Sequence, residues 1–218
     1  MGGDHTALMD KVYRRQRHIY DFTRKYYLLG RDRLVRELDA KPGERVVEIG
    51  CGTARNLIRI AGRYPGVQLY GLDASREMLQ TANESVRRKG LESRITLAYG
   101  VAEELTPAAF GLEGTFDHAI FSYSLSMIPD WRAALRAAAA AVKPQGHIHI
   151  VDFSDFGGLL PPARRALLAW LGLFHVAPRN ELVVGIEKAL GTTGLHQMMG
   201  RYAFLVRAVP RQVVLIAG

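Results

Sequence analysis

The fold is decided by two stretches of the chain, VVEIGCGTARN at residues 46–56 and LYGLD at residues 69–73. The first begins as an apolar strand and runs through a glycine turn into a helix, and the second is an apolar strand that ends in a carboxylate. Gly50 and Gly52 let the backbone pass close to a ligand, because no Cβ stands in the way. Asp73 lies about 20 residues after the glycines, where a carboxylate can grip a ribose diol. Together the stretches predict a site for a ligand that contains a nucleoside.

The glycine pattern separates two kinds of nucleoside ligand. A dinucleotide site with G-x-G-x-x-G would need a third glycine at Arg55, so a pyrophosphate cradle is poorly matched and an NAD-dependent oxidoreductase is disfavoured. The pattern E-x-G-x-G-T instead resembles the first motif of class I S-adenosylmethionine (SAM) methyltransferases, although their commonest form has one more glycine where this chain has Ala54. The resemblance implies SAM as cofactor. The alternative is that the glycines only form a tight turn and that Asp73 only caps the next helix.

Composition bounds the class of protein. The chain has 218 residues, of which 48% are hydrophobic, which suits one α/β domain of a soluble protein. Its single cysteine, Cys51, excludes an internal disulfide and fits the cytoplasm, and we interpret it as a small turn residue rather than a nucleophile. No signal peptide is apparent, and the longest apolar run, Ala166–Phe174, is too short to span a bilayer. The net charge of +8 favours an anionic partner, either nucleic acid or an acidic membrane surface.

Alternating strand and helix patterns predict a Rossmann-like α/β fold of the class I methyltransferase type, with a seven-stranded, mostly parallel sheet, helices on both faces and an N-terminal helical cap. We expect residues 1–40 to form that cap over substrate and cofactor, and residues 41–218 to form the SAM-binding domain. The expected strands are Arg45–Ile49, Val67–Leu72, Ile95–Tyr99, His118–Phe121, His147–Val151, Arg201–Val206 and Gln212–Ala217, the last two joined through Pro210. The expected helices are Ala54–Arg63, Ser75–Lys89 and Trp131–Val142.

The expected cofactor contacts follow the carboxyl ends of the strands. Glu48 should orient the glycine turn or meet the amino group of SAM, unless it is simply a satisfied strand-end carboxylate. Asp73 should accept both ribose hydroxyls. By resemblance, the loop after the third strand contacts the adenine edge through its backbone, although many relatives have Asp where this chain has Val101. The full set of predicted cofactor residues is Glu48, Gly50, Cys51, Gly52, Asp73, Ala74, Met78, Val101, Ala102 and Ser122.

The N-terminal segment is rich in tyrosine. Tyr13, Tyr20 and Tyr27 are spaced by seven and share one helix face with Arg24, with Tyr26 close by. The stripe could face the core, but a core helix would favour Leu and Ile, because every buried phenol needs a hydrogen-bond partner. Tyrosine faces also stabilise a quaternary ammonium group by cation–π attraction. The stripe therefore indicates either a core face or a pocket for a methylated amine.

Residues 9–34, MDKVYRRQRHIYDFTRKYYLLGRDRL, resemble the opening of bacterial diacylglyceryl-homoserine N-methyltransferases, which make the betaine lipid diacylglyceryl-N,N,N-trimethylhomoserine. Further similarity lies at residues 48–56, 122–129, 149–153 and 174–178. The resemblance implies a SAM-dependent enzyme that successively methylates a lipid amine. The N-terminal run is its specific part, because enzymes that act on very different substrates share the SAM motifs.

Methyl transfer from a sulfonium is an in-line displacement, so the amine must arrive neutral and correctly aimed. We expect Tyr27 and Tyr123 to orient the amine, with Tyr20 as a further catalytic candidate. Arg24 or Arg201 could pair with the homoserine carboxylate. The predicted substrate residues are Tyr13, Arg24, Tyr26, His149 and Arg201. His147 and His149 face the same way on one strand, and we interpret them as satisfied strand histidines rather than metal ligands, so no metal site is expected.

The lipid interpretation also accounts for the charge. Basic residues crowd the first helices, and an anionic membrane would attract them, although they could equally form an ordinary solvated face. Residues 159–174 combine Arg164 and Arg165 with leucines and Trp170, which suits either an interfacial helix or a plain buried one. We therefore expect a cytoplasmic protein at the inner membrane face. The alternatives are another amine, a quinone or RNA as acceptor, although the chain carries no recognised RNA-binding motif.

Overall fold

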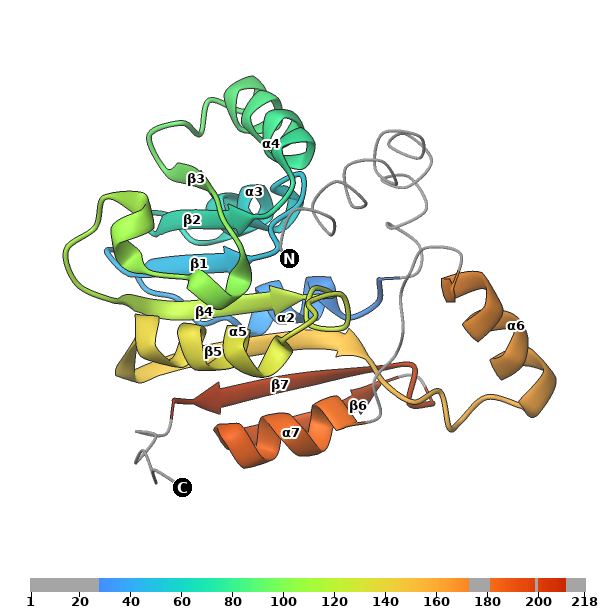
Figure 1. Ribbon diagram of the computed structural model, residues 1–218. Coiled ribbons are helices and arrows are strands. Elements are labelled where there is room, and N and C mark those ends of the chain that lie inside the picture. Colours follow the sequence, from blue (N-terminus) through green and yellow to red (C-terminus); the bar gives the residue numbers. More distant parts are fainter. Residues whose placement is uncertain (1–27, 173–180, 199, 211–218) are drawn as a thin grey trace.

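The computed structural model describes residues 28–172, 181–198 and 200–210 (Figure 1). Strands and helices alternate along most of this part of the chain. Its strands are β1 (Arg45–Ile49), β2 (Gln68–Asp73), β3 (Ile95–Tyr99), β4 (Phe116–Ser122), β5 (Val142–Phe153), β6 (Gly191–Met198) and β7 (Ala203–Val209). Its helices are α2 (Arg31–Glu37), α3 (Arg55–Arg63), α4 (Arg76–Arg88), α5 (Trp131–Ala141), α6 (Pro161–Gly172) and α7 (Glu181–Ala189), with two short 3-10 turns, η1 (Ala102–Glu104) and η2 (Pro107–Phe110).

These strands form one seven-stranded sheet in the order β3-β2-β1-β4-β5-β7-β6. The first five strands in this order run parallel to one another, and β7 runs antiparallel to both β5 and β6. The strand order reverses between β1 and β4, so the connections that leave these two strands run in opposite directions. The crevice between these connections, outside the carboxyl ends of the strands, is where α/β sheets bind ligands. The predicted Rossmann-like methyltransferase fold is confirmed. The N-terminal cap predicted for residues 1–40 lies largely outside the described residues.

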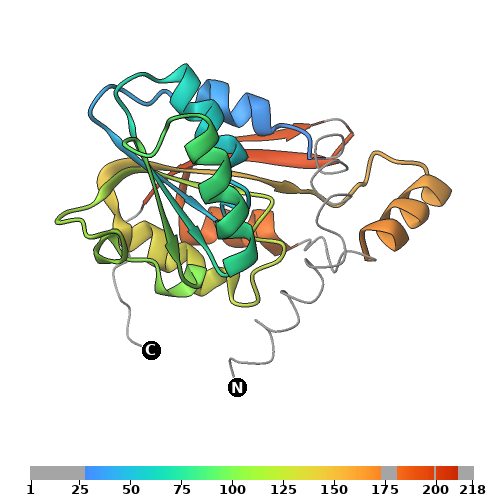
Figure 2. The ribbon, with the colours of Figure 1, turned by 90° about the horizontal axis from the view of Figure 1, so that it is seen from above.

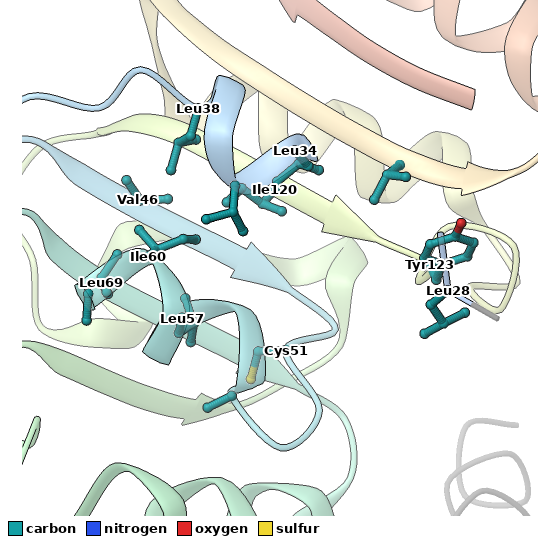
Figure 3. Close-up of a cluster of buried hydrophobic side chains, with 14 of the residues drawn as sticks. Leu28, Leu34, Leu38, Val46, Cys51, Leu57, Ile60, Leu69, Ile120 and Tyr123 are labelled. Atoms are coloured by element: carbon teal, nitrogen blue, oxygen red, sulfur yellow. The ribbon is translucent and has the colours of Figure 1, made fainter. Parts of the chain in front are cut away.

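Side chains alternate along each strand, so each face of the sheet has its own core. Val46 packs with α2, α3 and α4, whereas its neighbour Val47 packs with α5 and α7. Figure 3 shows the first of these cores, where Leu34 of α2 lies beside Ile120 of β4 and Leu57 of α3 lies near Cys51 of the glycine turn. Figure 2, seen from above, shows helices on both sides of the strands. Two apolar layers therefore hold the strand ends in place.

The last hairpin differs from its prediction. The strand expected at Arg201–Val206 is present as β7, but its hairpin partner is β6, which precedes it in the chain. The strand expected at 212–217 lies outside the described residues. Gly200 and Arg201 both have a φ of 64° and supply the left-handed turn between β6 and β7. The sequence of β6, GTTGLHQM, has few apolar residues, because it forms the edge of the sheet and its pattern is weak.

Helix α6 projects from the body of the protein (Figures 1 and 2). Its first six residues are exposed and only Leu171 is buried, so for the described residues of this segment, up to Gly172, the interpretation as a plain buried helix is wrong. Leu160, just before the helix, is 75% exposed. Among the helices of the described ranges, none is long and apolar enough to cross a membrane.

Candidate functional site

The glycine turn after β1 is held against the ends of two other strands. The backbone N–H groups of Gly50 and Cys51 both donate to the Leu72 carbonyl oxygen of β2, at 2.8 and 3.0 Å. Gly50 has a φ of 73°, and a Cβ at this position would lie 2.6 Å from the Cβ of Ser124, which follows β4. Only glycine therefore fits between the two strand ends. The turn leaves its backbone open toward the crevice, as a close-approaching ligand requires.

Asp73 braces this turn from the end of β2. Its Oδ2 accepts the N–H of Gly52 at 2.7 Å, and its Oδ1 accepts the N–H of Ser75 at 2.9 Å. The cap of α4 is Ser75, whose hydroxyl accepts the N–H of Met78, so Asp73 does not itself cap the helix. A carboxylate offers about four acceptor positions, so each of its oxygens can accept more than one hydrogen bond. The same group can thus shape the turn and bind the nucleoside.

Glu48 lies beneath the turn and is 2% exposed. Its Oε1 accepts the side-chain N–H of Asn56 in the first turn of α3 at 2.7 Å. A small cavity of about 40 Å³ opens here, lined by both residues together with Leu28, Arg31, Ser122, Arg55 and the turn at 50–53. Glu48, Gly50, Cys51, Gly52 and Ser122 were predicted as cofactor residues, and the fold brings these five to one cavity. The lining has the polar groups that an amino-acid moiety needs.

Ser122 gives an independent sign of a ligand. It is the last residue of β4, it is buried, and it lines the same cavity. Within the described part of the chain, its hydroxyl has no hydrogen-bond partner. A buried hydroxyl without a partner costs free energy unless a ligand satisfies it. The residues of the cavity therefore fit a bound polar cofactor.

The expected adenine side lies at the ends of β2 and β3. Asp73 is in register with Tyr99, and the N–H of Gly100 donates to the Asp73 carbonyl at 3.1 Å. Beyond them, Val101 is 38% exposed and Met78 is buried. The remaining predicted residues of this side, Ala74 and Ala102, are exposed and buried respectively. Their positions around one strand end are compatible with a contact to a flat base.

Cys51 is buried in the turn. Burial raises the pKa of its thiol well above the ordinary value, and the nearby carboxylates of Asp73 and Glu48 raise it further. A thiol is a good nucleophile only as the thiolate. The structure therefore agrees with Cys51 as a small turn residue.

Tyr123 follows β4 directly and is buried. It has a φ of 57°, and its hydroxyl donates to the carbonyl oxygen of Leu29 at 2.5 Å. Burial and the nearby Asp152 raise the pKa of this phenol well above its ordinary value, so it stays protonated. The side chain ties the segment before α2 to the end of β4. Its predicted role in orienting an amine stays a prediction.

Other predicted residues lie away from this cavity. His149 is in the middle of β5 and lines a different cavity. Arg201, in the turn between β6 and β7, pairs with Asp155. The predicted residues Tyr13, Tyr20, Arg24, Tyr26 and Tyr27 lie outside the described residues. Their roles stay predictions.

Asp152 is bonded to the loop that follows β4. It is fully buried in β5, where its Oδ2 accepts the N–H of Ser126 at 3.0 Å and its Oδ1 accepts the N–H of Phe153 at 2.8 Å. Burial raises the pKa of this carboxyl to about 6, although these hydrogen bonds lower it. The carboxyl therefore fixes the loop 123–126 after β4.

Five lining residues were not predicted, namely Leu28, Arg31, Thr53, Arg55 and Asn56, and two of them make polar contacts at the cavity. Arg31 belongs to the short helix α2 and is buried beside the turn, and its Nε donates to the Leu28 carbonyl at 3.3 Å. Asn56 is the partner of Glu48. The polar Asn56 on the buried, otherwise apolar face of the amphipathic helix α3 was the available signal, whereas the position of Arg31 depends on how α2 docks.

The fold and this cavity define a SAM-dependent methyltransferase. Residues 13–196 match the family model described as "Methyltransferase domain", and the chain belongs to this family. In the family, SAM supplies a methyl group on a sulfonium sulfur. Glu48, the turn at 50–53, Asp73 and Ser122 are the residues that we predict would hold it.

Two relatives carry the same printed name, demethylmenaquinone methyltransferase. The protein of Bacillus cytotoxicus is 33% identical over 126 residues, which cover 57% of this chain and 51% of the relative. That of Corynebacterium glutamicum is 31% identical over 166 residues, covering 68% of this chain and 66% of the relative. The chain thus matches between about half and two thirds of the length of these relatives.

Solved structures share the fold at low sequence identity. A SAM-dependent methyltransferase from Aquifex aeolicus superimposes with a TM-score of 0.65 at 18% identity, covering 86% of this chain and 93% of that one. A Haemonchus contortus phosphoethanolamine N-methyltransferase 2 in complex with SAM superimposes with a TM-score of 0.67 at 18% identity, covering 84% of this chain and 52% of that one. These likenesses concern the fold alone.

Proposed function

We propose that this methyltransferase acts on the amine of diacylglyceryl homoserine and adds methyl groups in succession, up to the trimethylated betaine lipid. The choice of this acceptor rests on the resemblance of residues 9–34 to the opening of bacterial diacylglyceryl-homoserine N-methyltransferases. The cofactor cavity supports the reaction class. Its residues would be common to methyltransferases with many acceptors, so the N-terminal segment distinguishes among them.

The chemistry of the acceptor side suits an amine. An amine lone pair must point at the methyl carbon from the side opposite the sulfur, so the protein has mainly to position two groups and exclude water. Ser122 and the loop 123–126 lie at the end of β4, beside the turn that would hold the methionine part. Tyr123 remains protonated and Asp152 is bonded to backbone N–H groups, so within the described residues this wall serves positioning better than strong general-base catalysis.

A membrane surface is the proposed partner, because the acceptor is a glycerolipid. Helix α6 projects with Arg164 and Arg165 exposed beside the exposed Leu160. A basic residue near an anionic surface contributes about 1 kcal/mol to binding, and apolar side chains can enter the headgroup region. We propose peripheral association with the cytoplasmic face of the membrane through this helix and the basic N-terminal segment.

A quinone is the second candidate acceptor. The relatives from Bacillus cytotoxicus and Corynebacterium glutamicum are named as demethylmenaquinone methyltransferases, which supports a lipid-borne quinone. This candidate would place an aromatic carbon, rather than an amine nitrogen, at the end of β4. Both acceptors are carried by long apolar chains, so both agree with a membrane surface as partner.

Mass spectrometry of diacylglyceryl homoserine in anionic vesicles, after incubation with the purified protein and SAM, tests the proposal. We expect products with one to three added methyl groups, which disappear with Asp73→Ala. SAM binding without any methylated lipid would overturn the amine acceptor and leave the methyltransferase class intact.

A further inference from the structure

The first turn of α3 carries a charge that the helix itself disfavours. Arg55 is the first residue of α3, and the N-terminus of a helix has a partial positive charge that repels cations. Helices α4 and α5 begin with a capping side chain, Ser75 and Asp130, whereas the residue before α3 is Ala54, which offers none. The N–H groups of the first turn of α3 therefore have no side-chain cap. An anion at this end of α3 would relieve the repulsion and accept from these N–H groups.

Arg55 also lies in the lining of the cofactor cavity. Among the residues that the structure describes, no carboxylate pairs with it. By contrast, Arg59, one turn further along α3, pairs with Asp32 at 2.7 Å. The charged residues of the cavity lining are Arg31, Glu48 and Arg55, so positive charge is in excess there. A cation without a partner at a ligand cavity indicates an anionic group on the ligand.

Asn56, the next residue of α3, gives an independent sign of what lies beside that anion. It is 6% exposed and lines the same cavity. An ionised carboxylate cannot donate, so the amide NH₂ of Asn56 must face Oε1 of Glu48, at 2.7 Å, and the amide oxygen points away from Glu48. Within the described ranges, that Oδ1 has no hydrogen-bond donor. A buried acceptor of this kind requires a donor on the ligand.

An α-amino acid carries the two groups that these residues need. Its ammonium group is a donor, its carboxylate is an anion, and both are attached to one carbon. The acceptors of Asn56 and Glu48 and the cation of Arg55 likewise line one cavity. A phosphate dianion would match Arg55, but it would meet the acceptor oxygens of Asn56 and Glu48 without offering them a hydrogen. The lining therefore favours the amino-acid end of SAM over a phosphate group.

We propose that Arg55, together with the first N–H groups of α3, binds the α-carboxylate of SAM, while Asn56 and Glu48 accept hydrogens from its α-ammonium group. Arg55 is then the residue that selects a cofactor with an intact amino-acid end over analogues that lack the carboxylate. The ligand-free protein bears the cost of this selection, because a cation remains at the positive end of α3. The inference concerns the cofactor alone, so it is independent of whether the acceptor is an amine or a quinone.

S-adenosylhomocysteine is the probe, because it keeps the amino-acid end of SAM and has no methyl group to transfer. Calorimetric titrations of the full chain compare it with its decarboxylated and its deaminated analogue. We expect the unmodified protein to bind each analogue roughly tenfold more weakly. Arg55→Gln should weaken S-adenosylhomocysteine and the deaminated analogue roughly tenfold, and should leave the decarboxylated analogue within about twofold. Arg63→Gln, the same change in the exposed last turn of α3, should leave all three affinities unchanged.

The melting temperature of the ligand-free proteins separates binding from folding. Arg55→Gln removes a cation from the positive end of α3, so this variant should melt at or above the temperature of the unmodified protein, whereas Arg63→Gln should melt at or below it. Equal weakening of all three ligands by Arg55→Gln, or an unchanged affinity for S-adenosylhomocysteine, would overturn the proposal. Equal binding of the three ligands by the unmodified protein would overturn it too and leave the methyltransferase class intact. Failure of S-adenosylhomocysteine to bind at all would overturn the cofactor assignment as well.

Discussion

The two sides of the cofactor crevice are built in different ways. The cofactor side is made by one continuous strand–turn–helix, residues 45–63, and by Asp73 on the adjacent parallel strand. The proposed acceptor side comprises the loop 123–126, Asp152 on β5 and the segment that leads into α2. The first side is built mainly from residues close together in the sequence, so a short motif identifies it. The second depends on long-range packing, so it can change with the acceptor while the cofactor side is kept.

The largest effect should come from Gly50→Ala on the cofactor side. The new Cβ would require a positive φ and would lie 2.6 Å from Ser124, and these two costs together amount to about 2–5 kcal/mol. We expect SAM affinity to fall by roughly 100-fold or more in calorimetric titrations, with a lower melting temperature.

Gly62→Ala in α3 is the matched control, because nothing lies within 4 Å of the position that its new methyl group would take. It should stabilise the protein by about 0.5–1 kcal/mol, since alanine favours a helix. SAM affinity of Gly50→Ala equal to that of the unmodified chain would contradict the close-approach account of the turn.

On the acceptor side, the pH dependence of stability should report Asp152. Its pKa is raised from 3.8 to about 6 in the folded protein. The stability that it contributes is therefore complete below about pH 4 and is lost as the pH rises to about 6, by about 3 kcal/mol. In urea unfolding, Asp152→Asn should be more destabilising at about pH 4 than at about pH 7 by this amount. An equal effect at both pH values would show that the carboxyl is not perturbed.

The buried histidines change stability with pH in the direction opposite to Asp152, over part of the same pH range. Burial lowers the pKa of His118 and, more strongly, of His149. Their contribution is present above the ordinary histidine pKa and is lost as the pH falls through it toward the lower folded value. The contribution of Asp152 must therefore be taken from the difference in stability between the unmodified protein and Asp152→Asn at each pH.

Asp73→Asn tests the charge on the cofactor side. The amide keeps the size of the side chain but removes the carboxylate that accepts from Gly52 and would accept from ribose. A charge-assisted contact contributes about 1.5–3 kcal/mol, so SAM should bind roughly 10- to 100-fold more weakly. Asp32→Asn, which removes a surface partner of Arg59, should leave SAM affinity unchanged. Equal losses in the two variants would mean that the effect is not specific to the site.

Tyr123→Phe sharpens the contrast between the two sides. The variant loses the hydrogen bond to the Leu29 carbonyl, which should cost about 1 kcal/mol of stability. Because the hydroxyl is on the acceptor side, we expect turnover to fall roughly tenfold while SAM affinity stays within about threefold. Turnover and calorimetry on one preparation measure both. A loss confined to SAM affinity would place Tyr123 on the cofactor side.

The smallest effect should come from α6. Replacing both Arg164 and Arg165 with Gln should weaken binding to anionic vesicles by at most about 1 kcal/mol per residue at low salt. Arg87→Gln with Arg88→Gln, in the last turn of α4, provides a charge-matched control. Flotation of the variants with vesicles measures the difference. Equal binding of both double variants would exclude α6 as the membrane contact.

The contrast between a side built from residues close in sequence and a side built by long-range packing also explains what could be predicted from the sequence. Strand β1, the turn and α3 are adjacent in the chain, and the parallel pairing of β1 with β2 brings Asp73 to Gly52, so spacing alone places them. The shared facing of His147 and His149 also follows from strand alternation. Their contact with His118 does not, because it depends on the register of β4 against β5. Arg31 and β6 were missed for a similar reason, since tertiary packing and sheet-edge pairing position them.

The most direct test of the account offers both acceptors at once. Diacylglyceryl homoserine and demethylmenaquinone are incorporated in equal amounts in anionic vesicles, and methyl transfer from isotope-labelled SAM into each is followed by mass spectrometry. We predict label in the homoserine lipid, with none in the quinone, and loss of that label with Asp73→Asn at limiting SAM. Label in the quinone alone would contradict the amine acceptor and establish the second candidate.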